Sequence, residues 1–442
     1  MRPLLVFCCL CLASPAARAD ATDDFITAHL AKKQIPGVAI MVRDRGKLVR
    51  AQGYGMANLE HGVAVKPETV FQSGSVGKQL TAMAVMTLVD ERKLSLDDPV
   101  AKYLPVPATW APITVRHLLT HTSGLGDYPE SFSLQKDYTE DELLRMVVAT
   151  PLAFRPGEKW AYSNLGYVTL GILIHKVSGQ FYGDLLTQRV FRPLGMTTTR
   201  IISEADIIPN RAAGYRLVDG VLKNQEWVSP TINSTADGSL YFTVLDLARW
   251  DEGLEAGKIV GRASYDAMWS PVRLNDGSTA PYGFGWSLGK NAAGHRLIEH
   301  GGEWQGFTAY IARHPDEQLS IAVLCNRAGG DPAYIARRVA GFYRPELAPK
   351  AHQAVRVDVA RLRAYVGRYR LDDRFTLEVM LSGDGRLRTV SRSETHEIIP
   401  ESETDFFEED SDRTYRFVKG PDGKVTALVI HVPEVLTFRR LP

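Results

Sequence analysis

Ser75 and Lys78 are the first residues whose types and spacing could support nucleophilic catalysis. They lie three positions apart in Ser75-Val76-Gly77-Lys78, and residues at that spacing share one face of a helix. A serine hydroxyl needs a base at neutral pH, and a lysine amine whose pKa is lowered by burial can be that base. Ser-x-x-Lys is also typical of a helix cap followed by a surface lysine, so the motif needs partners.

Two later segments carry groups that suit such a centre. In Tyr162-Ser163-Asn164, a phenol beside a cationic lysine can relay a proton, and an amide side chain can bind a substrate amide. In His300-Gly301-Gly302-Glu303, the glycines let a substrate approach the backbone, whose N–H groups can hold an oxyanion. Read singly, each segment is also compatible with an ordinary turn.

Short β-like runs at both ends of the first 341 residues must position these segments. An antiparallel hairpin is predicted over residues 38–54 around Asp44-Arg45-Gly46, and three more strands over residues 296–299, 307–312 and 319–324. Helical periodicity fills the middle, over residues 78–94, 141–148, 167–177 and 245–254. The pattern predicts an α/β fold of the α+β type, with one antiparallel sheet built from both ends and helices packed on it, rather than a doubly wound parallel sheet.

The texture changes after residues 342–355, where two prolines and a polar cluster indicate a linker. β-like runs follow at residues 376–381, 387–390, 415–418 and 424–432, with glycine-rich turns at 383–385 and 420–423. We therefore expect a larger domain over residues 20–341, which carries the three motifs, and a small all-β, barrel-like domain over residues 356–442. The acidic run 401–412 is interpreted as a solvated loop between strands, because it has no regular spacing of metal ligands.

Taken in order, the three motifs resemble the serine β-lactamase and penicillin-binding-protein superfamily, whose pattern is Ser-x-x-Lys, Ser/Tyr-x-Asn and Lys/His-Thr/Ser/Gly-Gly. The likeness is greatest to the class C type branch, which also holds carboxylesterases, D-stereospecific peptidases and amidases. It extends from about residue 23 to residue 326, and other stretches agree with it: His117–Leu125, Asp237–Leu240, Tyr282–Trp286 and Gly306-Phe307. The resemblance implies an antiparallel sheet flanked by helices, an all-helical subdomain and an appended lipocalin-like barrel.

The resemblance also implies a role for each motif residue. Ser75 would be the acylated nucleophile, and Lys78 and Tyr162 would share proton transfer. Asn164 would orient the substrate, and His300 would stand where relatives carry a lysine. The remaining substrate-binding positions are Gly302 and Glu303, with the backbone N–H groups of Ser75 and Glu303 forming the oxyanion hole.

One departure from the pattern bears on the substrate. Gly301 has no hydroxyl where relatives carry a threonine that helps bind the carboxylate of a β-lactam or a peptide. We therefore predict a serine hydrolase that cleaves an ester or a D-amino-acid amide or peptide bond, with weak or no β-lactamase activity. Two alternatives remain: a β-lactam-hydrolysing enzyme or DD-carboxypeptidase, and a non-catalytic penicillin-binding sensor.

The first nineteen residues have the order of a cleaved export signal. A basic start precedes an apolar run over residues 4–13 and a small-residue site at Ala17-Arg18-Ala19. Cys8, Cys9 and Cys11 lie inside it, so Cys325 would be the one mature cysteine. Removing the signal leaves 50 basic and 51 acidic residues, a balance that predicts no nucleic-acid partner. We expect a periplasmic or secreted protein with no membrane span and a small-molecule substrate.

Two other kinds of site were weighed against the hydrolase interpretation. His117 and His121 are four positions apart, as zinc ligands on one helix can be, but no glutamate follows His117 as in HExxH. The Gly-x-Ser-x-Gly elbow of α/β-hydrolases lacks its first glycine, because Ser73 stands there. The sequence therefore predicts no metal and no cofactor.

Overall fold

The computed structural model describes residues 15–371, 375–391, 394–432 and 434–441. They form two compact units, one made of the chain up to Arg216 with Leu222–Ala348, the other of Leu217–Val221 and the chain from Pro349. Most of the expected export signal, with Cys8, Cys9 and Cys11, lies outside the described residues. The description begins with helix α1, Pro15–Lys33.

A seven-stranded sheet forms the centre of the first unit. Its order is β11-β12-β13-β14-β1-β2-β3, and every neighbouring pair is antiparallel. The strands are β1 Gly37–Asp44, β2 Lys47–Asn58, β3 Val63–Ala64, β11 Ser287–Lys290, β12 Arg296–Trp304, β13 Phe307–His314 and β14 Leu319–Cys325. Because β1 pairs with β14, the two ends of the unit share one sheet, which confirms the predicted α+β arrangement and the hairpin at Asp44-Arg45-Gly46.

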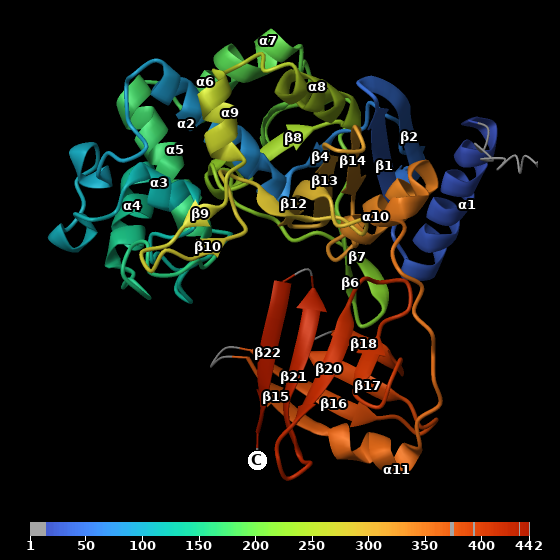
Figure 1. Cartoon of the computed structure of the whole chain (residues 1–442). Coiled ribbons are helices and arrows are strands. Elements are labelled where there is room, and N and C mark those ends of the chain that lie inside the picture. The colour runs from blue at the N-terminus through green and yellow to red at the C-terminus, as the bar shows by residue number, and fades with distance from the viewer. Residues whose placement is uncertain (1–14, 372–374, 392–393, 433, 442) are drawn as a thin grey trace, which may run out of the picture. The chain divides into compact units, whose positions relative to one another are not determined.

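The strands alternate between two hydrophobic cores, as the two-residue period of a strand requires. Val38, Ile40 and Val42 of β1 pack in one core with residues of α1 and of α10, Pro332–Tyr343. Ala39 and Met41 face the other core, which holds the remaining helices of the unit (Figure 1). The sheet thus separates a terminal helical layer from the side that carries the predicted catalytic motifs.

The helices on the motif side follow the predicted periodicity with shifted ends. The four expected helices are α2 Lys78–Asp90, α4 Glu140–Ala149, α5 Asn164–Ser178 and α8 Val244–Glu255. Shorter ones are α3 Val115–Leu119, α6 Tyr182–Leu186, α7 Arg192–Leu194 and α9 Arg262–Met268. The expected end of α2 at Leu94 is wrong, because the chain turns at Arg92 with a φ of 56°. None of the described helices combines the length and apolar character that crossing a bilayer requires.

Small sheets complete the first unit. The most relevant to the motifs has the order β4-β8-β5, with β4 Phe71–Gln72, β8 Leu240–Phe242 and β5 Arg200–Ile201. A two-stranded sheet of the same unit is formed by β9 Val272–Arg273 with β10 Thr279–Ala280. Strands β6 Tyr215–Val218 and β7 Val221–Asn224 pair with each other, and their tip, Leu217–Val221, is assigned to the second unit. Strand β4 leads directly into the segment that contains Ser75.

The second unit is a closed barrel of the strands β15 to β22, which confirms the predicted small all-β fold. The strands are β15 Gly367–Arg370, β16 Thr376–Leu381, β17 Leu387–Ser391, β18 Glu394–Pro400, β19 Asp405–Phe407, β20 Thr414–Lys419, β21 Val425–Val432 and β22 Glu434–Arg440, preceded by the short helix α11 Val359–Leu362. The interpretation of residues 401–412 as a loop is wrong in part, because β19 lies within it. Phe406 is buried in the barrel core and Phe407 is also buried, so two apolar side chains anchor this strand within the acidic run.

Candidate active site

Ser75 lies in a 3-10 turn, Gly74–Gly77, between β4 and α2. We expected Ser75 to lie on the helix itself, but α2 begins only at Lys78. The turn is held from below by Ser73, whose Oγ donates to the carbonyl of Gly238 at 2.7 Å and accepts from the N–H of Leu240 at 3.2 Å. The Ser75 hydroxyl therefore lies on a short turn that hydrogen bonds fix in place, directly before a buried helix.

Lys78 is completely buried, and its ammonium faces Ser75. Nζ donates to Ser75 Oγ at 2.9 Å, to Asn164 Oδ1 at 2.8 Å and to the carbonyl oxygen of Asp237 at 2.5 Å. Burial lowers the pKa of Lys78 to about 8, although the carboxylates of Asp237 and Asp127 act in the opposite direction. Near neutral pH a useful fraction of the amine is therefore unprotonated and within reach of the Ser75 proton.

Tyr162 and Asn164 converge on this amine from the start of α5. Nζ of Lys78 lies 4.9 Å from the centroid of the Tyr162 ring. The helix begins here because Ser163 caps it, its side chain accepting from the N–H of Gly166 at 3.0 Å. Asn164 is thereby the first helical residue, and its Nδ2 donates to both carboxylate oxygens of Asp127 at 3.2 Å.

Two buried histidines lie behind these groups. His121 packs on the Tyr162 ring with centroids 4.3 Å apart, and its Nδ1 accepts from the Ser163 N–H at 3.1 Å. His300 Nδ1 is 2.6 Å from its neighbour's carbonyl, that of Gly301, so this nitrogen carries the proton and Nε2 accepts from Tyr282 at 2.8 Å. Burial lowers the pKa of His300 to about 4. His300 thus occupies the expected position as a neutral hydrogen-bonding group without the charge of a lysine.

Close backbone packing brings two N–H groups to the nucleophile. A Cβ on Gly302 would lie 2.3 Å from the carbonyl of Ser73 and 2.8 Å from the nitrogen of Ser75, and one on Gly74 would lie 2.4 Å from the nitrogen of Glu303. Only glycines allow this approach. The N–H groups of Ser75 and Glu303 are consequently close enough together to serve as paired oxyanion donors.

The motif His300–Glu303 lies inside β12, although the sequence indicated that it follows a strand. Pairing of β12 with β11 stops at Glu299, whereas pairing with β13 continues to Trp304. The glycines therefore sit on a strand that has lost one ladder partner, and its free edge is available to a substrate. Gly301 is exposed, and a Cβ there would meet its nearest atom only at 3.9 Å.

Asp237, Asp127 and Tyr128 complete the site. Asp237 lies in a stretch that agrees with the family resemblance, but no catalytic role was predicted for any of the three residues. Asp237 is buried, and its carboxylate accepts from Thr235 at 2.6 Å and from Tyr128 at 3.1 Å. Its main-chain carbonyl, which binds Lys78, leaves no signature in a sequence. The spacing of Asp127 from Asn164 along the chain likewise gave no sign of their contact.

The described residues contain no group of three or more His, Cys, Asp or Glu side chains placed to hold a metal ion. His117, weighed as a zinc ligand with His121, instead closes a helix cap, its Nδ1 accepting from the N–H of Thr114 at 3.1 Å. His121 belongs to the Tyr162 side of the site. The groups that lie around Ser75 Oγ and Lys78 Nζ are the Asn164 amide and the Tyr162 phenol ring.

Comparisons with known proteins agree with this geometry. The model of a family described as Beta-lactamase matches residues 22–343, and a domain of unknown function, DUF3471, matches residues 351–441. Penicillin-binding protein 4* of Bacillus subtilis is 29% identical over 400 residues, covering 85% of this chain and 88% of that protein. D-aminopeptidase of Brucella anthropi is 31% identical over 310 residues, 67% of this chain, and the match spans 57% of that relative's length.

Solved structures show the same fold over nearly the whole chain. The octameric penicillin-binding protein homologue from Pyrococcus abyssi matches with a TM-score of 0.68 and 28% identity, covering 95% of this chain and all of that one. SurE matches with a TM-score of 0.63 at 23% identity, over 97% of this chain and all of that one. The second likeness supports the fold alone.

Proposed function

The chain belongs to the beta-lactamase family, and from this premise we propose that it is a serine hydrolase that cleaves an ester or a D-amino-acid amide or peptide bond through an acyl-enzyme on Ser75. The single observation that carries the proposal is the contact of a buried amine, Lys78 Nζ, with Ser75 Oγ at 2.9 Å. An amine with a pKa of about 8 is suited to accept the serine proton near neutral pH.

In acylation, Ser75 Oγ forms a bond to the carbonyl carbon of the substrate while its proton passes to Lys78 Nζ. The carbonyl oxygen becomes an oxyanion between the N–H groups of Ser75 and Glu303, each such donor contributing about 3 kcal/mol. The bond to the leaving group then breaks, and the leaving group takes a proton relayed from Lys78 through Tyr162. Water repeats the sequence in deacylation and restores the Ser75 hydroxyl.

Asn164, His300 and Gly302 serve binding and positioning in this proposal. Asn164 Oδ1 accepts from Lys78 Nζ and so orients the amine, and the Asn164 amide would hydrogen-bond the amide or ester of a substrate. His300 presents a neutral imidazole tied to Tyr282, and Gly302 allows β12 to approach the nucleophile. Weak β-lactamase activity follows from the missing hydroxyl at Gly301 and from the uncharged His300.

The direct test is a hydrolysis panel with p-nitrophenyl esters, D-amino-acid amides, a D-Ala-D-Ala peptide and a chromogenic cephalosporin. We expect esters or D-amides to be hydrolysed and the cephalosporin slowly or not at all. Ser75→Ala should abolish every activity, and Ser95→Ala, on an exposed serine, provides a matched control. Hydrolysis that survives Ser75→Ala would contradict the nucleophile, and fast cephalosporin turnover would favour the β-lactamase alternative.

The non-catalytic sensor is the second candidate function. It has one supporting observation, the similarity to proteins named for penicillin binding. A stable Ser75 adduct with benzylpenicillin in intact-mass spectra, together with no turnover of any panel substrate, would favour the sensor over the hydrolase.

Export to the periplasm or outside the cell is part of the proposal. Expression of the full chain with its first nineteen residues should give a protein whose N-terminus is Asp20, as read by N-terminal sequencing of the extracytoplasmic fraction. Retention of the whole chain in the cytoplasm would contradict it.

A further inference from the structure

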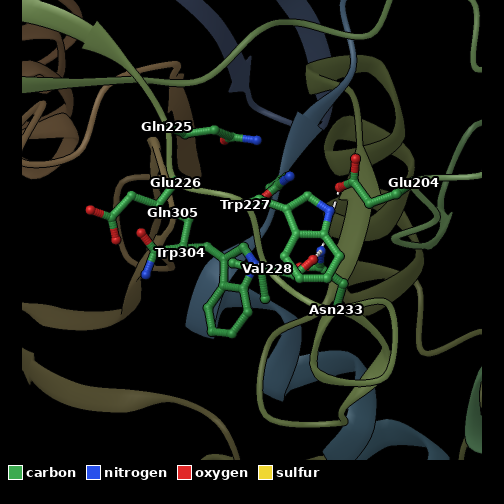
Figure 2. Close-up of a pocket in the computed structure, with 9 residues that line it drawn as sticks. Glu204, Gln225, Glu226, Trp227, Val228, Asn233, Trp304 and Gln305 are labelled. Carbon is green, nitrogen blue, oxygen red and sulfur yellow. Dashed lines mark hydrogen bonds between the residues drawn. The ribbon is translucent and has the colours of Figure 1, made fainter. Parts of the chain in front are cut away.

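Two pockets of the first unit differ in the charges on their walls. The pocket in Figure 2 is lined by two carboxylates, those of Glu204 and Glu226, and none of its described lining residues is basic. The second, the α8–α9 pocket, has a volume of about 460 Å³ and is lined by residues of β1, β12, β13, β14, α8 and α9. Its charged side chains are Arg43, Arg262, Arg296, Arg313, Asp251 and Glu255. Because arginines outnumber carboxylates there, the α8–α9 pocket is the one suited to an anion.

The register of the sheet places three of these arginines on one face. Ile298 of β12 is paired with Arg313 of β13. Arg313 is paired in turn with Ser320 of β14, and Ser320 with Arg43 of β1. Residues directly opposite each other in a sheet point to the same side, and Arg296 shares that side because it lies two positions before Ile298. The strands therefore hold the three arginines in fixed positions along one end of the pocket.

One of the four arginines has no carboxylate partner. The other three arginines and the carboxylates that pair with them are Arg43, Arg262 and Arg313, and Asp251, Glu255 and Asp266. Arg296 forms no ion pair with any residue that the structure describes, and its guanidinium donates to the main-chain carbonyl of Trp269 at 3.2 Å. His314, also on the wall, adds no charge, because burial lowers its pKa to about 4. Four positive charges thus meet three negative ones, and a monoanion would balance them.

Arg296 and Arg313 both have N–H groups that a ligand can reach. Arg313 donates to Asp251 through Nε at 2.6 Å, and its two terminal nitrogens have no acceptor among the described residues. Neither nitrogen is completely buried, and Arg296 is exposed. Trp269 brings the two side chains together, because Arg296 binds its carbonyl and the Cζ of Arg313 lies 5.0 Å from its ring centroid. A carboxylate has two oxygens, so it can accept from both guanidiniums.

The rest of the wall is largely apolar. Its buried apolar side chains are Leu254, Val260, Tyr265, Ile298 and Leu319. Covering such a surface is favourable for an apolar ligand, and the exclusion of water strengthens a charge contact beside it. A small inorganic ion would leave this wall uncovered. The pocket therefore suits a ligand with one acidic end and an apolar body.

We propose that the α8–α9 pocket is a second binding site of this protein, for a small organic carboxylate. The carboxylate accepts from Arg296 and Arg313, and the apolar body of the ligand lies against the buried wall. Arg296 and Gly302 are six positions apart on β12, which is about 20 Å along a strand. The site is therefore separate from the Ser75 centre, and the inference does not depend on the proposed function.

The ligand class is tested by calorimetry of the full chain with 3-phenylpropanoate, 3-phenyl-1-propanol and inorganic phosphate. The carboxylate should bind. The alcohol lacks the charge and phosphate lacks the apolar body, so each should bind at least tenfold more weakly. No binding of 3-phenylpropanoate, or equal binding of either other probe, would overturn the inference.

Variants test where the carboxylate binds. Arg296→Gln removes the arginine without an ion-pair partner and should lower the affinity for 3-phenylpropanoate at least tenfold, with unchanged urea unfolding because Arg296 is exposed. Arg313→Lys keeps the charge beside Asp251 but loses the two terminal N–H groups, and should lower the affinity at least threefold. Ser75→Ala should leave it unchanged, as should the matched control Arg145→Gln, an exposed arginine of α4.

Two results would contradict this location. An affinity unchanged in Arg296→Gln or in Arg313→Lys would overturn the inference, because the carboxylate would then bind elsewhere. An equal loss of affinity in Arg145→Gln would also overturn it, because the effect would then reflect the net charge of the protein alone.

Discussion

Two clusters of buried charged or basic side chains in the first unit differ in how their charges are compensated. The amine cluster consists of Lys78, His121 and His300, and the arginine cluster of Arg43, Asp251 and Arg313. In the arginine cluster Asp251 is bound by Arg43 and, at 2.6 Å, by Arg313. Burial acts to lower the pKa of Arg43, but Asp251 and Glu255 together outweigh it and the pKa is raised.

In the amine cluster no carboxylate binds the amine directly, and Asp237 and Asp127 offset only part of the effect of burial. Lys78 forms no ion pair with a described residue, and its acceptors are a serine, an amide and a carbonyl. Burial lowers the pKa of Lys78 and of both histidines, and the positive charge of Lys78 lowers the histidine values further. Breaking a buried ion pair destabilises the fold. Burying an amine without a directly bound carboxylate also costs folding free energy, but it lowers the pKa of the amine and so makes the amine a better base near neutral pH. Substitutions in each cluster test that distinction.

The largest effect is expected for Lys78→Met. Loss of the base should lower kcat/KM about 10³-fold or more, and circular dichroism should show an intact fold. Because the pKa of Lys78 falls from 10.5 to about 8 on folding, stability is lost as pH falls from about 10.5 to 8. At pH 7 the free energy of unfolding of the variant should therefore exceed that of the wild type by about 1–2 kcal/mol. Denaturant unfolding measures this difference.

The control is Lys66→Met, on an exposed lysine, which should change neither quantity. If Lys78→Met kept more than a tenth of the wild-type kcat/KM, the assignment of Lys78 as the catalytic base would be contradicted.

Next in size is Asp251→Asn. Removing the shared carboxylate leaves Arg313 without its ion-pair partner and Arg43 with Glu255 alone, at 2.9 Å, which should cost about 3–5 kcal/mol in urea unfolding. Asp266→Asn breaks the exposed pair with Arg262 and should cost less than about 0.5 kcal/mol. A loss below about 1 kcal/mol for Asp251→Asn would remove the structural role of the arginine cluster.

Asn164→Asp should make the amine cluster resemble the arginine cluster. A carboxylate where Asn164 Oδ1 now accepts from Lys78 at 2.8 Å would raise the pKa of the amine by about one or more. The acid limb of the pH profile of kcat/KM should move to higher pH by the same amount. If the acid limb stayed at the same pH, its assignment to the titration of the Lys78 amine would be contradicted.

The smallest effect is expected for Asp127→Asn. The carboxylate of Asp127 acts to raise the pKa of Lys78, so its removal should lower that pKa by a few tenths and shift the same limb to lower pH. The difference in this pKa between the variant and the wild type should be smaller in 1 M salt, because Asp127 is exposed and salt screens its charge. A shift of the limb to higher pH would contradict this electrostatic effect of Asp127.

Much of the fold could be predicted because its signals are local. The hairpin at Asp44-Arg45-Gly46 follows from turn chemistry, and Ser75 and Lys78 meet because three positions separate them. Half of the barrel strands were missed, among them β19, which is only three residues long, lies within an acidic run and depends on its neighbouring strands for its placement.

The contacts that tune the site could not be predicted. Lys78 binds a main-chain carbonyl, that of Asp237, which any residue could supply. His121 gave a zinc-like spacing with His117, yet it packs on Tyr162, 41 positions later in the chain. The continuation of β12 through Gly301 and Gly302 depends on its pairing with β13, which outweighs the weak strand propensity of glycine.

Acylation of Ser75 with the Lys78 amine as base is the step on which the proposed function depends. It is tested most directly by following the burst of p-nitrophenol from an acyl ester between about pH 6 and 10, with peptide mapping of the trapped adduct. We expect an acyl group on Ser75 and a burst rate that rises to a plateau with a pKa near 8. An adduct on another residue, or a rate that does not change with pH, would contradict this mechanism.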